Sequence, residues 1–184
     1  DIAGWVANSS GYLEPKKYSF VVYGDNRNNG ITENKIHRRL LGLINIKEKD
    51  FIVHLGDMVL WHGAWGSFSK DIASADIKVP LFGVRGNHDD KQRFLNKFKI
   101  EKPYYSIDYG IAHLIIIDDN KGHIDEQQYK WLVNDLEGHQ DYKWIIILAH
   151  KPLYSCAHNG VRKSLITQLE PLFKKYNVKM FIAS

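Results

Sequence analysis

Carboxylate, amide and imidazole side chains directly follow four short apolar segments of the sequence. The segments end at Asp25, at Asp57, at Asn87 with His88, and at His150. A run of about four to eight apolar residues is typical of a buried strand, and open α/β sheets bind their ligands beyond the carboxyl ends of the strands. We therefore expect these side chains, which are far apart in the sequence, to meet at one edge of a sheet.

Side chains of these types bind hard or borderline divalent metal ions. Taken alone, an aspartate after a strand more often caps a helix, so the argument depends on the whole set. A carboxylate that bridges two ions about 3.5–4 Å apart lets the pair hold a phosphoryl group and generate hydroxide. The pattern therefore favours metal-dependent hydrolysis of phosphate esters, in which a metal-bound hydroxide attacks phosphorus.

The order and spacing of these segments resemble the calcineurin-like metallophosphoesterases. The matching segments are Gly24-Asp25-Asn26-Arg27, Gly56-Asp57, Gly86-Asn87-His88-Asp89 and Ala149-His150, and the resemblance extends from about residue 19 to residue 184. It implies that Asp25, Asp57, Asn87 and His150 are metal ligands, with Asp57 bridging two ions. It also implies that His88 is a catalytic residue that stabilises the phosphoryl oxygens or protonates the leaving group.

The resemblance implies divalent or trivalent metal cofactors, with two ions in the intact protein. Mn, Fe, Zn and Ni all accept mixed oxygen and nitrogen ligands, so the pattern leaves the metal open. The segment from His150 to His158 resembles the purple acid phosphatase branch of the family, which makes His158 a candidate substrate-binding residue. An exposed loop histidine is the other interpretation of His158.

Arg27 departs from the family pattern. Most members carry a histidine ligand there, and a permanently charged guanidinium has no lone pair with which to replace it. Purple acid phosphatases instead place a tyrosine three residues after the bridging aspartate, where this chain has Leu60. We therefore expect the first ion to bind weakly or to be absent, and Arg27 to pair with Asp25 or to bind a phosphate oxygen of the substrate.

A second departure lies at the end of the sequence. The family follows its last strand with a Gly-His-X-His motif that gives one ligand to each ion, and this sequence stops at Ser184, where that strand is expected to end. The resemblance thus implies a fold that is incomplete at the C-terminus. It also implies that the intact protein continues with that motif and that the chain ending at Ser184 holds metal at most weakly.

Hydrophobic periodicity predicts the elements that must position these residues. Strands are expected at 18–23, 51–57, 79–84, 143–149 and 178–183, with a hairpin of 104–108 and 111–117; helices are expected from Thr32 to Ile46, up to Ala75, at 91–98, from Asp125 to Gly138, and at 161–176 with a break before Pro171. The first helix should bury Ile36, Leu40, Leu43 and Ile44. This order indicates an α/β fold of two facing sheets, and the resemblance implies a four-layer αββα sandwich with two mixed β-sheets.

Length, composition and charge limit the remaining possibilities. A chain of 184 residues with 44% hydrophobic residues suits one domain, here 18–184, after an N-terminal tail at 1–17. The net charge of +4 comes from scattered basic residues, so nucleic acid is not an expected partner. The expected partner is the phosphate ester that the metal-ligand pattern indicates. No apolar run approaches the roughly 18 residues of a membrane span, so we expect no membrane insertion.

Two other functions remain open. A binding or scaffold domain that keeps the fold without catalysis is favoured by Arg27 and by the end of the sequence at Ser184. A nuclease-type phosphodiesterase would use the same ligands. A protein phosphatase is disfavoured, because the Asp-Arg pair expected after the bridging aspartate is replaced by Leu60 and Trp61.

Overall fold

Three parallel strands form the first sheet of the described part of the chain. The computed structural model describes residues 18–30, 34–156 and 160–184. Strands β1 (Phe20–Tyr23), β2 (Phe51–His54) and β3 (Leu81–Gly83) pair in the order β1-β2-β3. All four residues of β2 are buried, as expected for a central parallel strand that is covered on both faces.

The second sheet combines antiparallel and parallel pairing. Its described strands are β4 (Tyr105–Tyr109), β5 (Ala112–Ile116), β6 (Trp144–Leu148) and β7 (Met180–Ile182), in the order β4-β5-β6-β7. Strands β4 and β5 form the predicted antiparallel hairpin, and the β5–β6 and β6–β7 pairs are parallel. The carboxyl ends of β5 and β6 therefore lie at the same edge of this sheet.

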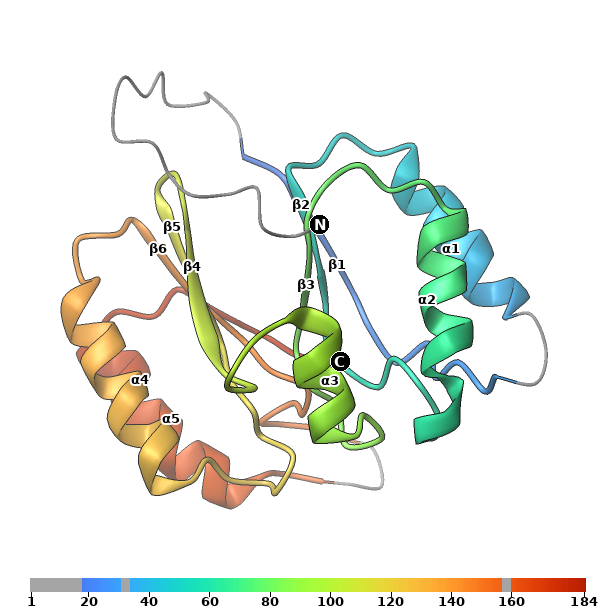
Figure 1. The fold of residues 1–184 in the computed structure, drawn as a ribbon. Coiled ribbons are helices and arrows are strands. Elements are labelled where there is room, and N and C mark those ends of the chain that lie inside the picture. The colour runs from blue at the N-terminus through green and yellow to red at the C-terminus, as the bar shows by residue number, and fades with distance from the viewer. Residues whose placement is uncertain (1–17, 31–33, 157–159) are drawn as a thin grey trace.

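Helices cover the outer faces of both sheets. Their bounds are α1 (Lys35–Asn45), α2 (Trp65–Ser74), α3 (Lys91–Phe98), α4 (Glu126–Gly138) and α5 (Lys163–Lys175). Helices α1 and α2 lie outside the first sheet and α4 and α5 outside the second, with the two sheets facing each other between them (Figure 1). The expected four-layer αββα sandwich is confirmed. None of the helices in the described part of the chain is long and apolar enough to cross a membrane.

Alternation along β5 and β6 divides the core between the layers. One set of side chains packs against α4 and α5, namely Ile115, Ile117, Ile145 and Ile147. The alternate set packs between the two sheets together with residues of β2, namely Leu114, Ile116, Ile146 and Leu148. Both sets are almost completely buried, so the register of these strands is fixed on both faces.

The structure corrects the apolar face predicted for α1. Ile36 and Leu43 are 82% and 53% exposed, whereas the helix buries His37, Leu41 and Ile44. The histidine is accommodated because its Nδ1 lies 3.3 Å from Asp71 Oδ2 and its ring stacks on a phenylalanine of α2. The helix is capped by Asn34, whose side chain accepts the backbone N–H of His37; the predicted cap, Thr32, lies outside the described residues.

The break predicted before Pro171 is also wrong, because α5 continues through the proline. A proline inside a helix removes one hydrogen bond and costs about 3 kcal/mol. Burial of Leu165, Leu169 and Leu172 on both sides of it against the second sheet holds the two halves of the helix together. The helix predicted from Asp125 is confirmed, with the Asp125 side chain accepting the N–H of Gln128.

We expect acid to destabilise the fold through His37. Burial lowers the pKa of this histidine, although the hydrogen bond and negative charge of Asp71 oppose the shift. A histidine that stays neutral in the fold is protonated first in the unfolded chain, so its stabilising contribution is present above the unfolded pKa of about 6.5 and is lost as the pH falls. His37→Gln should therefore flatten the fall in unfolding free energy between pH 7 and pH 5, as measured by urea denaturation. The exposed His123→Gln variant should keep the slope of the unchanged protein; equal slopes in all three proteins would refute this assignment.

Candidate metal centre

The loops that follow β1 and β2 run side by side and carry two aspartates. The backbone N–H of Asp25 donates to the carbonyl of Gly56, and the N–H of Arg27 donates to the carbonyl of Asp57, both at 3.0 Å. Asp25, Arg27 and Asp57 have φ angles of 54°, 44° and 52°. This left-handed conformation costs a side-chain-bearing residue about 1–2 kcal/mol. Strained backbone of this kind concentrates at functional sites.

Two glycines allow the loops after β2 and β3 to approach each other. A Cβ atom at Gly86 would lie 2.0 Å from the backbone nitrogen of Asp57 and 2.3 Å from its Oδ1. A Cβ at Gly56 would lie 2.7 Å from the nitrogen of Gly86 and 2.9 Å from Nδ1 of His150. No larger residue fits at either position without moving the backbone, so both glycines are needed to place Asp57 beside the third and sixth strands.

The carboxylate of Asp57 is completely buried and only partly satisfied. Its Oδ1 accepts the backbone N–H of His88 at 3.0 Å. Its Oδ2 has no hydrogen-bond donor, although Nη2 of Arg27 lies 3.0 Å away at an angle unsuited to a hydrogen bond. Because a buried carboxylate is costly unless it is paired, the Arg27 guanidinium compensates Oδ2, and Oδ1 is the oxygen that faces His150.

His150 is oriented as metal ligands usually are. Its Nδ1 donates to the backbone carbonyl of Leu55 at 2.9 Å, so in a neutral ring the lone pair lies on Nε2. That nitrogen lies 3.2 Å from Oδ1 of Asn87 and 3.4 Å from Oδ1 of Asp57. Three electron-rich atoms at these distances need a proton or a metal cation among them. The donor set of Asp57, Asn87 and His150 therefore fits one metal ion, with the orienting hydrogen bond in place.

Arg27 lies on the other side of Asp57. Its Nη2 is 3.3 Å from Oδ1 of Asp25 and 3.0 Å from Oδ2 of Asp57, so the guanidinium contacts both carboxylates. Ligand atoms of Asp25, Asp57 and His150 all lie within 4.8 Å of one another. A positive charge nevertheless already lies between the two aspartates. The described residues thus fit an ion on the Asn87 side of Asp57 and not a second ion on the Arg27 side.

His88 and Asp89 have different surroundings. Nδ1 of His88 donates to the carbonyl of Leu60 at 2.9 Å, and its Nε2 lies 3.9 Å from Oδ2 of Asp57 in a partly exposed ring. Asp89 accepts the backbone N–H groups of Met58, Val59 and Gly86. Burial raises the pKa of Asp89 to about 6 against the effect of these amides. Asp89 therefore links the loops after β2 and β3 through hydrogen bonds, and the Leu60 carbonyl orients the His88 ring.

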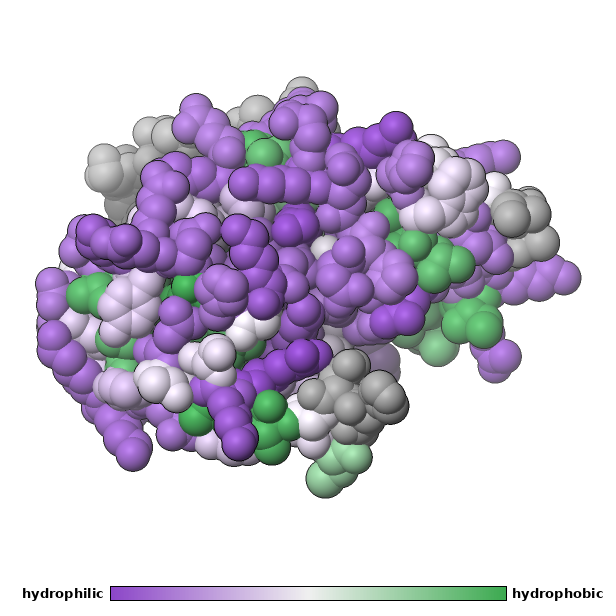
Figure 2. All heavy atoms as spheres, turned by 90° about the horizontal axis from the view of Figure 1, so that it is seen from below, coloured by the Kyte–Doolittle hydropathy of each residue, from purple (hydrophilic) through white to green (hydrophobic). Residues whose placement is uncertain are grey.

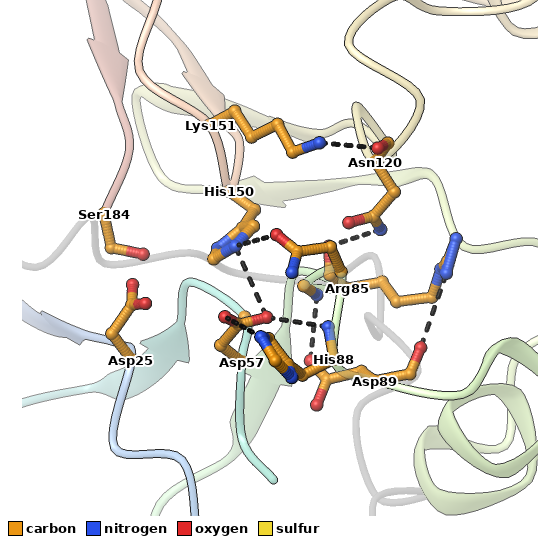
Figure 3. A network of polar contacts seen from close by, with 12 residues as sticks. Asp25, Asp57, Arg85, His88, Asp89, Asn120, His150, Lys151 and Ser184 are labelled. Carbon is orange, nitrogen blue, oxygen red and sulfur yellow. Dashed lines mark hydrogen bonds and ion pairs between the residues drawn. The ribbon is translucent and has the colours of Figure 1, made fainter. Parts of the chain in front are cut away.

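The loop after β5 places polar residues against Lys151, next to His150, and sequence patterns alone did not single these residues out. Oδ2 of Asp119 accepts the backbone N–H of Lys151, the residue that follows His150, at 2.7 Å. The Lys151 ammonium donates to the Asn120 carbonyl, and the Asn120 side chain donates to the carbonyl of Arg85 (Figure 3). Asp119 follows a buried strand just as Asp57 does, and that pattern was its only signal. His158 lies outside the described residues.

A separate hollow lies beside β7 and α5. It has a volume of about 420 Å³ and is lined by Pro152, Leu153, Tyr154, Glu170, Phe173, Phe181 and Ala183. None of the candidate metal ligands lines it. Its mainly apolar wall offers no set of donors for a metal ion.

Comparison with known proteins gives a family match. A family model described as Calcineurin-like phosphoesterase matches residues 8–184. Acid phosphatase type 7 of Mus musculus is 30% identical over 71% of this chain and 38% of its own length. Purple acid phosphatase 17 of Arabidopsis thaliana is 23% identical over 93% of this chain and 64% of its own length. The chain thus spans less than two thirds of the length of these curated relatives.

Solved structures share the fold. A purple acid phosphatase, PPD1, from yellow lupin seeds has a TM-score of 0.70 at 19% identity, covering 96% of this chain and 39% of its own. GAP50, the anchor in the inner membrane complex of Plasmodium, has a TM-score of 0.74 at 18% identity, covering 90% and 65%. A dimetal phosphatase from Danio rerio has a TM-score of 0.67 at 14% identity, covering 90% and 80%. At these identities the likeness concerns the fold alone.

Adding one methyl group at Gly86 tests the close approach of the loops. Gly86→Ala should lower the unfolding free energy by about 1–3 kcal/mol, the usual cost of overpacking, because the new Cβ meets the Asp57 backbone. Gly42→Ala in α1 is the control, since a Cβ there meets nothing within 4 Å. It should leave stability unchanged or raise it by about 0.5–1 kcal/mol. A Gly86→Ala protein as stable as the control in urea denaturation would contradict the packing argument.

Proposed function

The chain belongs to the calcineurin-like phosphoesterase family, and on this premise we propose that it hydrolyses phosphate esters at a metal ion held by Asp57, Asn87 and His150. Relatives that are named acid phosphatases support a phosphoester hydrolase. The single observation that carries the proposal is the lone pair of His150 Nε2, which faces the oxygens of Asn87 and Asp57 within 3.4 Å.

The protein's own groups determine what such an ion would do. When bound there, an ion such as Mn, Fe, Zn or Ni polarises a phosphoryl oxygen and provides a hydroxide nucleophile at neutral pH. The buried Asp57 and His150 and the exposed Asn87 would hold it, with the Leu55 carbonyl fixing the His150 ring. His88 keeps Nε2 available because Nδ1 is held by the Leu60 carbonyl. Nε2 of the neutral ring is an acceptor, so the protonated form of His88 is the one that donates a proton to the leaving group or a hydrogen bond to a phosphoryl oxygen.

Arg27 takes the place that a first ion would need. Its guanidinium neutralises Asp25 and Asp57 through Nη2. Among the described residues, Nε and Nη1 of Arg27 form no hydrogen bond or ion pair, since its contacts all involve Nη2. These N–H groups can therefore bind a phosphate oxygen of the substrate, because the planar guanidinium presents its donors in a fixed fork. Arg27 is then both the second positive charge of the centre and a substrate-binding residue.

Among the described residues, the face of the molecule seen in Figure 2 carries no large hydrophobic patch. On the face seen from below in the orientation of Figure 1, hydrophilic residues predominate and hydrophobic residues form small, separate groups (Figure 2). The net charge of +4 favours anions in general. We propose a phosphate monoester or diester as the substrate, and nucleic acid remains disfavoured by the scattered basic residues. Rates on nitrophenyl phosphate and on its bis ester would separate monoesterase from diesterase.

A binding or scaffold domain without catalysis is the second candidate. The observation that favours it is the contact of Arg27 with both Asp25 and Asp57, which leaves fewer ligands for metal than a two-ion centre needs. It does not account for the orientation of His150 towards Asn87 and Asp57. Metal content and catalysis separate the two candidates.

Metal stoichiometry tests the proposed centre. We expect elemental analysis of the full-length protein to find one ion per chain at this centre, and His150→Ala to lose that ion and to lower kcat/KM for nitrophenyl phosphate more than tenfold. Arg27→His should raise the count by one, because a neutral imidazole replaces the guanidinium and can ligate. Absence of bound metal, together with no phosphatase activity in added manganese, would instead favour the scaffold.

Loss of His88 should affect catalysis and not metal binding. Because a positioned proton donor contributes about 10²–10⁴-fold to a rate, His88→Ala should lower kcat for nitrophenyl phosphate by at least about 10²-fold. The ion count should stay unchanged, since His88 Nε2 is 3.9 Å from Asp57 and not among the proposed ligands. His123→Ala, at an exposed histidine, is the control and should leave both quantities unchanged. A His88→Ala enzyme with the original kcat would remove this residue from the mechanism.

A further inference from the structure

Two exposed hydrophobic side chains lie in the loop that follows Asp57. Leu60 and Trp61, called the apolar rim below, are 44% and 45% exposed. The residues directly before them, Met58 and Val59, are completely buried. Single exposed hydrophobic residues are normal on protein surfaces. The position and the rigidity of this pair therefore decide whether it has a role.

The backbone of Leu60 connects the two groups that are proposed to act on phosphate. Its N–H donates to the carbonyl of Asn28, the residue after Arg27, at 2.8 Å. Its carbonyl accepts Nδ1–H of His88 at 2.9 Å. Nη2 of Arg27 and Nε2 of His88 lie 3.0 Å and 3.9 Å from the same atom, Oδ2 of Asp57. The apolar rim thus borders the space in which these two side chains would bind a phosphate group.

The exposed indole ring of Trp61 is held in a fixed position. Its N–H donates to the backbone carbonyl of Asn29 at 2.7 Å. The ring also lies edge-on to the His62 ring, with centroids 5.8 Å apart and planes at 80°. A Cβ at Gly63 would lie 2.0 Å from the Trp61 ring, so the indole packs on the bare backbone of this glycine. A side chain that is already ordered loses little conformational entropy when a ligand binds it.

The proposed reaction determines which part of a substrate would meet this ring. Hydrolysis joins a water oxygen to phosphorus and breaks the P–O bond to the alcohol, whose oxygen takes up a proton. Protonated Nε2 of His88 is placed to give that proton. Because Nδ1 of the same ring is held by the Leu60 carbonyl, an alcohol oxygen at Nε2 lies across one imidazole ring from Leu60. The carbon skeleton of the alcohol can therefore reach the apolar rim.

We propose that the apolar rim binds the alcohol part of the substrate, and that the substrate class is a phosphate ester of an aromatic or other bulky apolar alcohol. This inference rests on the proposed function, because it places the phosphate group beside Arg27 and His88. Trp61 offers a rigid aromatic face, and aromatic rings prefer to pack on one another in stacked or edge-to-face arrangements. Leu60 extends this apolar surface, so both side chains determine specificity.

A purely structural role for Trp61 is the competing interpretation. Through its hydrogen bond to Asn29, the indole could simply hold the loops after β1 and β2 together. Its loss would then lower the rate on every ester by the same factor. Binding of the alcohol part predicts instead a loss that depends on the alcohol, so two esters separate the interpretations.

Kinetics of the metal-loaded, full-length protein on benzyl phosphate and methyl phosphate test the inference, because the two alcohols have similar acidity. We expect kcat/KM to be at least about tenfold higher for benzyl phosphate. Trp61→Ala should lower the value for benzyl phosphate by about tenfold and change that for methyl phosphate by less than about twofold. Trp61→Phe, which keeps an aromatic ring, should recover part of the loss. Trp144→Ala is the matched control, since this tryptophan is 40% exposed at the start of β6, the end away from His150; it should change neither value.

Leu60→Ala gives a second test that leaves the Trp61 ring in place. It keeps the backbone carbonyl that holds His88 and should also lower kcat/KM more for benzyl phosphate than for methyl phosphate. Equal values for the two esters in the unchanged protein, or equal losses on both in the rim variants, would overturn the inference and leave the proposed function standing. Absence of hydrolysis of either ester by the unchanged protein would remove the proposed function and this inference with it.

Discussion

The buried carboxylate of Asp57 is the constraint on which the centre of this molecule depends. A carboxylate without solvent must be compensated by hydrogen bonds or by positive charge. Here the N–H of His88, the guanidinium of Arg27 and the cation expected beside His150 surround it. The absence of a side chain at Gly86 lets these groups come close enough. The two facing sheets and the tight loops that follow their strands together hold the Asp57 carboxylate in position.

Part of this arrangement could be predicted from the sequence for a simple reason. Parallel strands of one sheet end at the same edge, so apolar runs that end at Asp25 and Asp57 already indicate that these two side chains converge. The expectation of a single sheet edge was wrong for His150, which follows β6 of the second sheet and reaches Asp57 because the two sheets face each other. Contacts between distant polar residues leave no such signal. The predicted face of α1 was right for Ile44 and in part for Leu40. It missed His37, because the partner that makes this histidine a core residue, Asp71, lies 34 positions further along the chain.

The same limitation explains the remaining differences. No motif in the sequence includes His113 or His139, and only the hairpin register and the end of α4 bring them together with Asp108. Pro171 argued for a break, because local preference does not include the burial of neighbouring leucines. Arg27 could be recognised as a departure, but its contact with both Asp25 and Asp57 required coordinates.

The left-handed backbone at Asp25, Arg27 and Asp57 limits which substitutions these loops can accept. Asparagine and glycine adopt this conformation readily, whereas valine, isoleucine and threonine resist it because their branched Cβ meets the neighbouring carbonyl. Evolutionary drift at these positions is therefore confined to a small set of residues even before charge is considered. The N–H of Arg27 donates to the carbonyl of Asp57 and its guanidinium contacts two carboxylates, so the conformation of the first loop is tied to the position of the second.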